Sequence, residues 1–228
     1  EVYTALANTG GFSPGELAAI EEKAYALGAM RHVTLDVTGE YYERCIRYMV
    51  YGNVMRNKTY PVSVSSERTF QALAIVRYAK EIGAGALAHG STGAGNDQVR
   101  FDLCFSVFAP EMEIITPTRD LRLSREDEIA YLKAKGVERD WTKLAYSINK
   151  GLWGTSVGGR ETLTSDQPLP EEAYPSPLQR EGKEELILAF ERGELSAVNG
   201  TVYADKVDAI RAVEALAAPW AIGRDTHV

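Results

Sequence analysis

The chain has few of the residues and runs that mark several classes of protein. Among its 228 residues are two cysteines, Cys45 and Cys104, too few for a disulfide framework. No cysteine or histidine spacing indicates a zinc site. No run approaches the roughly 20 consecutive apolar residues that a membrane helix needs. We therefore expect a protein of the reducing cytoplasm, without a membrane span or a bound metal, whose two thiols are unpaired and buried.

Positive charge is also scarce. Lysine and arginine total 25 against 32 acidic residues, which gives a formal charge of −7 at pH 7. A nucleic-acid partner is not expected, because contacts to a phosphate backbone need clustered cations. A local basic site for a small anion remains possible in such a chain.

Alternating strand and helix patterns run through the first part of the sequence. Strands are expected at 2–7, 33–35, 86–89 and 114–116. Helices are expected at 14–27, 39–50, 70–82, 96–109 and 124–135. Strands separated by helices indicate a parallel sheet with crossover helices, which binds ligands beyond the carboxyl ends of its strands. The pattern weakens after about Trp141, with a hairpin-type pair in 186–203 and a helix at 206–216, so we place a domain boundary near residue 140.

A glycine-rich loop, residues 90–95, lies between a predicted strand and a predicted helix. Its glycines have the spacing GxxGxG, which is neither a Walker A loop nor a dinucleotide-binding fingerprint. Glycines let backbone N–H groups approach a ligand, and the N-terminus of the next helix adds partial positive charge. Asn96 is expected to cap that helix. The polar residues around the loop supply donors, an acceptor and a cation: Thr92, Asn96, Asp97 and Arg100. Together they indicate an anion-binding site.

Two further segments carry candidate ligand contacts. In Tyr60–Ser66, helix capping would account for Ser65 or Ser66, but not for Tyr60-Pro61. The segment 146–159 is too rich in glycine for a helix, and Ser147 and Ser156 are its candidates for ligand contact.

The run Ala88–Phe101, AHGSTGAGNDQVRF, closely resembles the segment HGxTGxGNDQxRF of the argininosuccinate synthase family. The resemblance covers essentially the whole chain, including Ala7, Tyr60-Pro61 with Ser65, and Ser147 to Ser156. It implies an α/β fold: a parallel-sheet nucleotide-binding domain of the ATP-pyrophosphatase (HUP, Rossmann-like) type at 1–140. The N-terminal part of an α+β synthetase domain would follow at 141–228.

The resemblance implies a ligase that joins citrulline to aspartate with ATP, in arginine biosynthesis and the urea cycle. The citrulline ureido oxygen attacks the α-phosphorus of ATP to give citrullyl-AMP and pyrophosphate, and the aspartate amine then displaces AMP. ATP enters as its Mg²⁺ complex. The implied enzyme is a cytoplasmic homotetramer without a membrane or nucleic-acid partner. Because no covalent nucleophile is needed, catalysis would consist of positioning and charge stabilisation.

The matching motif positions imply particular contacts. ATP would be contacted by Ala7 and Gly90. Aspartate would be contacted by Thr92, Asn96 and Asp97. Citrulline would be contacted by Tyr60, Ser65, Asn96, Arg100, Ser147 and Ser156. The chemistry agrees, because Arg100 can fork onto a carboxylate and Asp97 can hold an ammonium group.

The sequence departs from the family pattern in three places. Asn149 stands where many relatives carry an acidic residue. The family's triphosphate loop, SGGxDxS, would lie before Glu1, and a glutamate and a tyrosine of the citrulline site would lie beyond Val228, as would the helix that links subunits. We therefore expect a core fragment with little turnover and an unpaired edge beside its first strand. The alternatives are a non-catalytic binding module of the same fold and an ATP-pyrophosphatase with another acceptor.

Overall fold

A computed structural model describes residues 1–93, 95–137, 146–164 and 166–226. The chain divides into two compact units, and each unit is built from segments that are not continuous in the sequence. Unit 1 consists of Glu1–Ala7, Pro14–Leu35 and Ser65–Ala145. Unit 2 consists of Asn8–Ser13, Asp36–Val64 and Tyr146–Val228. The boundary expected near residue 140 falls outside the described residues.

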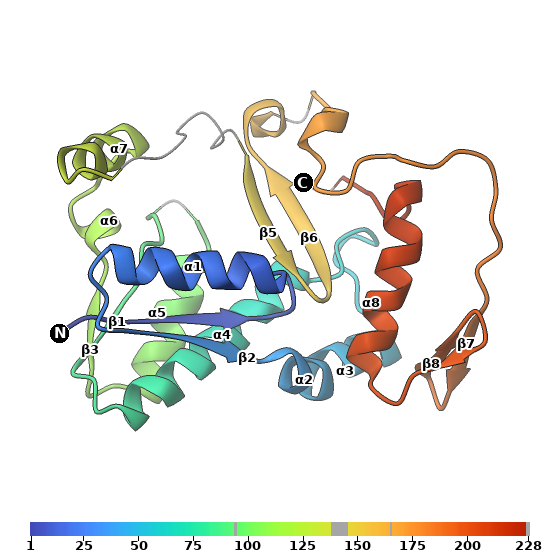
Figure 1. Ribbon diagram of the computed structural model, residues 1–228, viewed down its shortest axis with the longest axis horizontal. Helices are drawn as coiled ribbons and strands as arrows, with labels where there is room; N and C mark the ends of the chain where they lie inside the picture. Colours follow the sequence, from blue (N-terminus) through green and yellow to red (C-terminus); the bar gives the residue numbers. More distant parts are fainter. Residues whose placement is uncertain (94, 138–145, 165, 227–228) are drawn as a thin grey trace. The chain divides into compact units, whose positions relative to one another are not determined.

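The predicted alternation of strands and helices is confirmed at the start of the chain. Strand β1 (Tyr3–Asn8) pairs with β2 (Arg31–Asp36), and helix α1 (Pro14–Ala26) connects them. The two strands run in the same direction (Figure 1). Strand β3 (Ala86–Ala88) pairs with β4 (Glu113–Ile115) in parallel, through helix α5 (Asp97–Phe108).

The strands form two separate parallel pairs rather than one continuous sheet. Within the described residues, β1 pairs with β2 alone and β3 with β4 alone. Every strand of such a pair has one unpaired edge, so the vacant neighbour position expected beside the first strand stays a prediction.

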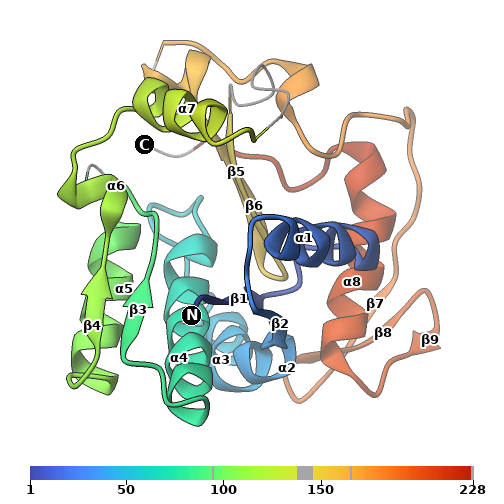
Figure 2. The same cartoon turned by 60° about the vertical axis from the view of Figure 1, so that its left-hand side comes forward.

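The core of unit 1 lies between α4 (Ser63–Glu81), α5 and β3, which Figure 2 shows side by side. The buried residues of α4 recur at helical spacing and pack with residues of α5 and β3. This cluster comprises Ala72, Val76, Ala79, Leu87, Cys104, Phe105 and Ala109. Burial raises the pKa of the Cys104 thiol, which keeps it protonated and unreactive. The expectation of buried thiols is wrong for Cys45, which is only half-buried.

The second segment of unit 2, Asp36–Val64, contains the region 39–50, for which the sequence predicts a single helix. This region consists instead of α2 (Thr38–Tyr41), a π-helical turn η1 (Tyr42–Ile46) and α3 (Arg47–Tyr51). The segment 146–159 is a hairpin of β5 (Ser147–Gly151) and β6 (Gly154–Gly158), so the exclusion of a helix there is confirmed.

The last part of unit 2 is an antiparallel sheet and a helix. The sheet has the order β7 (Leu188–Glu191), β8 (Glu194–Val198) and β9 (Thr201–Val202). Helix α8 (Lys206–Ala217) packs on β8, and its first turn is capped by Asp205, whose side chain accepts a hydrogen bond from the Val207 amide at 2.8 Å. The predicted strands and terminal helix are confirmed in type.

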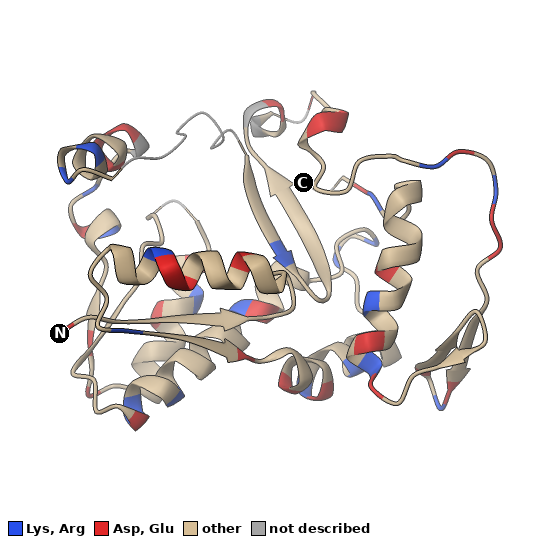
Figure 3. Cartoon of the chain, viewed as in Figure 1, with Lys and Arg blue, Asp and Glu red and all other residues tan. Residues whose placement is uncertain are grey.

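Short helices complete the described chain. They are α6 (Pro117–Asp120), α7 (Arg125–Ala134), η3 (Arg160–Leu163), η4 (Glu171–Ala173) and η5 (Ala218–Trp220). The connection before β7 carries alternating acidic and basic residues between 180 and 185 (Figure 3), all exposed. None of the helices in the described ranges is long and apolar enough to cross a membrane.

A hydrogen bond between Tyr42 and Glu194 ties the π-helical turn to β8. The Tyr42 hydroxyl donates to Oε1 of Glu194 at 2.7 Å, and Arg47 Nη2 lies 3.3 Å from Oε2 of the same carboxylate. Desolvation, followed by this hydrogen bond, raises the pKa of Tyr42 far above its ordinary value. The tyrosine therefore stays protonated, and a hydrogen-bond donor, at neutral pH.

We predict that Tyr42→Phe lowers the free energy of unfolding by about 1–2 kcal/mol, because the bond that it removes has a charged acceptor. Urea unfolding measures the change. The control is Tyr48→Phe, whose ring is 60% exposed; its effect is expected to stay below about 0.5 kcal/mol. Equal effects of the two substitutions would show that the bond contributes nothing.

Candidate functional site

The glycine-rich loop follows the carboxyl end of β3 and leads into α5, as predicted. Asn96 occupies the N-cap position of α5, but its side chain makes no capping hydrogen bond, so the expectation of an Asn96 side-chain cap is wrong. The reason is the backbone, with φ −81° and ψ −14°: a capping side chain usually needs an extended residue. The Asn96 amide is instead exposed at the start of the helix.

Asp97, the first residue of α5, lies between two arginines. Arg100 Nη1 lies 3.1 Å from its Oδ1, and Arg68 Nε lies 3.1 Å from its Oδ2. Arg68 comes from α4, its side chain is only 12% exposed, and it also contacts Glu67 and Gln71. Each carboxylate oxygen can accept two hydrogen bonds, so Asp97 retains the capacity to accept another donor.

Arg68 is not among the site residues predicted from the sequence. Its position could have indicated it, because Arg68 follows Ser65 by three residues and therefore lies on the same face of the helix. The helix α4 starts at Ser63, so Ser65 and Ser66 lie inside its first turn. The alternative that one of them caps the helix is therefore wrong.

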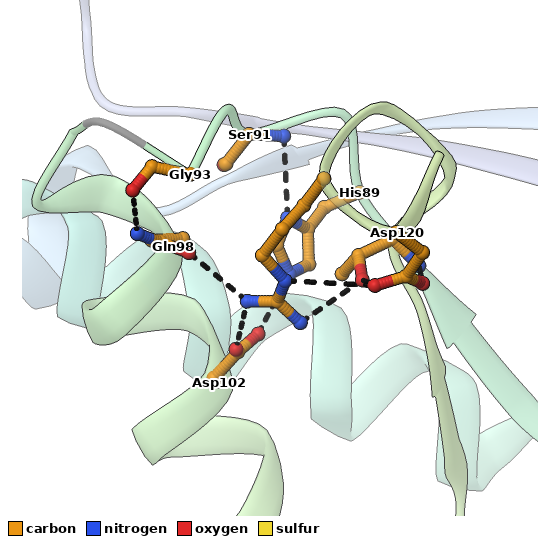
Figure 4. Close-up of polar contacts among 8 residues, drawn as sticks. His89, Ser91, Gly93, Gln98, Asp102 and Asp120 are labelled. Carbon is orange, nitrogen blue, oxygen red and sulfur yellow. Dashed lines mark hydrogen bonds and ion pairs between the residues drawn. The ribbon is translucent and has the colours of Figure 1, made fainter. Parts of the chain in front are cut away.

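A second polar network is connected to the loop (Figure 4). His89 Nε2 lies 2.8 Å from Asp102 Oδ1, and the other oxygen of Asp102 accepts from Arg119 Nη1. The Ser91 amide donates to His89 Nδ1 at 3.3 Å. Since Nδ1 accepts, the neutral ring carries its proton on Nε2 and donates it to Asp102.

The ionisation of Asp102 follows from these partners. Burial raises the pKa of the Asp102 carboxyl, but hydrogen bonds from Arg119 and His89 outweigh it, and the pKa lies below its ordinary 3.8. The hydrogen bond to Asp102 raises the pKa of Arg119 in turn. Because the folded pKa of Asp102 is lowered, its stabilising effect is complete above the unfolded value and is lost as the pH falls through the folded one.

The candidate residues of unit 2 are Tyr60, which lies in the segment that leads into α4, and Ser147 and Ser156, which lie on the β5–β6 hairpin. Trp153 Nε1 donates to the Pro61 carbonyl at 3.0 Å, which holds the turn of the β5–β6 hairpin against the segment after Tyr60. Ser147 pairs with Gly158 and Asn149 pairs with Ser156. Since side chains alternate along a strand, Ser147, Asn149 and Ser156 project from one face of the hairpin.

The hairpin also has the spacing of a hydrolase nucleophile. Gly154–Gly158 reads GTSVG, which matches GxSxG. Ser156 nevertheless lies in the middle of strand β6, whereas a nucleophile elbow needs a sharp turn from a strand into a helix. Ser156 is therefore not placed as a nucleophile, despite the match to GxSxG.

The structure distributes the predicted site residues over both units. Ala7 ends the part of β1 in unit 1, and it is buried. The other members in unit 1 are Ser65, Gly90, Thr92, Asn96, Asp97 and Arg100. Those in unit 2 are Tyr60, Ser147 and Ser156. Over the described residues, no group of three or more His, Cys, Asp or Glu side chains is placed to hold a metal ion.

Unit 1 has parallel strand pairs with helical crossovers, and its glycine-rich loop joins a strand to a helix N-terminus. That arrangement defines a nucleotide-binding type of α/β domain. A family model described as the arginosuccinate synthase N-terminal HUP domain matches residues 1–138. The chain belongs to the argininosuccinate synthase family.

Curated relatives extend the similarity beyond the HUP domain. Argininosuccinate synthase of Saccharolobus solfataricus is 40% identical over 182 residues, which are 79% of this chain and 46% of that protein. The Sulfolobus acidocaldarius protein of the same name is 37% identical, over 86% of this chain and 50% of that protein. That of Parasynechococcus marenigrum is 36% identical, over 98% of this chain and 56% of that protein. The chain thus spans about half the length of the relatives it matches.

Proposed function

We propose that the protein ligates citrulline and aspartate to argininosuccinate in an ATP-dependent reaction that passes through citrullyl-AMP and releases AMP and pyrophosphate. One observation carries the proposal: in a member of this family, the N-terminal turn of α5 presents Asp97 and Arg100 directly after the glycine-rich loop. These two residues offer opposite charges for the ammonium and carboxylate groups of amino-acid substrates.

Aspartate would be held by the loop and the start of α5. The Asp97 carboxylate, with lone pairs left beside its two arginines, would accept the substrate ammonium group. Thr92 and Asn96 are both exposed and would donate to the substrate carboxylates. Arg68 holds the Asp97 carboxylate in place through its 3.1 Å contact with Oδ2, so it acts on the substrate only through Asp97.

Citrulline would be held chiefly by Arg100. Its guanidinium makes one contact with Asp97 and has further N–H donors for an α-carboxylate. The remaining proposed citrulline contacts are hydroxyl and amide groups, from Tyr60, Ser65, Asn96, Ser147 and Ser156. They suit the neutral ureido group, because each can donate or accept a hydrogen bond.

ATP, as its Mg²⁺ complex, would be the third substrate. Among the described residues, an added Cβ at Gly90 would meet only Thr118 Oγ1, at 4.0 Å, which leaves room for a nucleotide beside this backbone. Ala7 would contribute the second contact. We propose residues 1–140 as the nucleotide-binding domain and 141–228 as the start of the synthetase domain, in a cytoplasmic homotetramer.

The test measures pyrophosphate release and argininosuccinate formation by the complete gene product that carries this sequence. Both should require citrulline, aspartate and MgATP. Pyrophosphate release with another acceptor in place of citrulline would support the alternative of an ATP-pyrophosphatase with a different acceptor. Binding of the amino acids without any pyrophosphate release would support the binding module and contradict the proposal.

We predict that Arg100→Lys raises the KM for citrulline about tenfold or more, because lysine keeps the charge but loses the planar fork. Steady-state kinetics with each substrate varied in turn measures it. The matched control is Arg211→Lys on α8, where Arg211 pairs with Asp208 at i,i−3 as Arg100 pairs with Asp97. An unchanged citrulline KM in Arg100→Lys would remove Arg100 from the citrulline site.

A further inference from the structure

We propose that Arg119, acting through Asp102 and Gln98, is a positioning residue that holds the glycine-rich loop in the conformation that binds aspartate and ATP. This inference rests on the proposed function, which assigns loop residues to those two substrates. Arg119 lies on α6, outside the loop and outside the motif that carries the family resemblance.

One path from Arg119 reaches the loop through Asp102 and His89. Arg119 donates to Oδ2 of Asp102, and Oδ1 of Asp102 accepts from His89 Nε2 at 2.8 Å. His89 Nδ1 then accepts from the Ser91 amide at 3.3 Å. The His89 side chain is only 10% exposed, so the ring has little water to replace a lost partner.

A second path reaches the loop through Gln98. The same Arg119 nitrogen, Nη1, donates to Gln98 Oε1 at 3.2 Å, and Gln98 Nε2 donates to the Gly93 carbonyl at 2.6 Å. Arg119 is itself oriented by Thr116, whose Oγ1 accepts from Nη2 at 2.9 Å, and by Asp120, 3.7 Å from Nε. Arg119 is therefore the residue at which both paths meet.

The two paths fix backbone groups on either side of Thr92. A loop with this many glycines loses much conformational entropy when it is ordered. Anchors at the Ser91 N–H and the Gly93 C=O restrict it before any substrate binds, which reduces that cost on binding. The residues that benefit are Gly90 and Thr92, whereas Arg100 lies on the regular part of α5. Loss of Arg119 should therefore weaken the binding of aspartate and ATP more than the binding of citrulline.

The first experiment compares Arg119→Gln and Arg119→Lys with the control Lys80→Gln, which breaks an exposed ion pair with Glu111 in the same unit. In Arg119→Gln we expect KM for aspartate and for MgATP to rise about fivefold or more, and KM for citrulline to change less than about twofold. In Arg119→Lys the two KM values should rise less, because lysine keeps a positive charge facing the Asp102 carboxylate. Lys80→Gln should match the wild type.

The second experiment observes the loop without catalysis. Hydrogen exchange at the Ser91 amide, followed by NMR in the chain 1–228, should speed up in Arg119→Gln and not in Lys80→Gln. His89→Asn keeps an acceptor near the Nδ1 position, and His89→Gln keeps a donor near Nε2 for Asp102. Ser91 should therefore stay better protected in His89→Asn than in His89→Gln.

The outcomes separate the two proposals. A wild-type protein that makes no argininosuccinate contradicts the proposed function, while the exchange data still test the network. An active wild type in which Arg119→Gln raises all three KM values equally, or leaves Ser91 exchange unchanged, contradicts the positioning role. A selective rise for aspartate and MgATP together with faster Ser91 exchange supports it.

Discussion

Gly11→Ala is expected to lower the free energy of unfolding by about 3 kcal/mol or more, because the new methyl group has no space. A Cβ at Gly11 would lie 1.9 Å from the Lys150 carbonyl oxygen and 2.4 Å from its carbon. Both are backbone atoms of β5, so no side-chain rotation relieves the clash. The neighbouring Leu152 amide donates to the Thr9 carbonyl at 2.7 Å, and that bond would be strained as well.

The matched control is Gly15→Ala, four residues further on in α1. A Cβ there meets no atom of the described residues within 4 Å. Because alanine also favours a helix, the free energy of unfolding should be unchanged or rise by up to about 1 kcal/mol. Urea unfolding of both variants measures the difference. If Gly11→Ala were as stable as Gly15→Ala, the close approach of 9–11 to the β5–β6 hairpin would be wrong.

This close approach is one reason why the sequence excluded a helix at 146–159 but did not predict the two strands of the hairpin. Its strands, Ser147–Gly151 and Gly154–Gly158, are polar and rich in glycine and lack the apolar alternation that marks a strand. Their position depends on partners far away in sequence, including Thr9 and Pro61. Such long-range pairing has no local signal. The strands and helices with strong periodicity, by contrast, were found from the sequence.

The candidate site, too, could be predicted from the sequence only in part. The motif around Asp97 and Arg100 was found because its residues are adjacent in sequence and carry opposite charges beside glycines. Arg68 and Arg119 contribute from other elements, 29 residues before Asp97 and 17 after Asp102, so only the folded chain reveals them. The Asn96 cap was expected from residue type alone, and the helical backbone of that residue overrode the preference.

Asp97→Asn is expected to reduce argininosuccinate formation at low aspartate between about tenfold and a hundredfold, the effect of removing a charged hydrogen-bond acceptor. The proposed partner of Asp97 is the aspartate ammonium group, which takes part only in the second step. Citrulline-dependent exchange of pyrophosphate into ATP, which reports the first step, should therefore fall much less. When both assays are run on one preparation, they give the ratio of the loss in ligation to the loss in exchange.

The loss of charge also disturbs the neighbours of Asp97, and the control must account for it. The substituted side chain would leave Arg68 and Arg100 facing one neutral amide, and the like charges would repel each other. Asp208→Asn removes a carboxylate from the equivalent i,i+3 pair with Arg211 on α8, so it reports the general cost of losing such a pair and should leave both assays unchanged. If Asp97→Asn lowered the exchange and the ligation equally, Asp97 would act through the arrangement of Arg68 and Arg100 and not through aspartate.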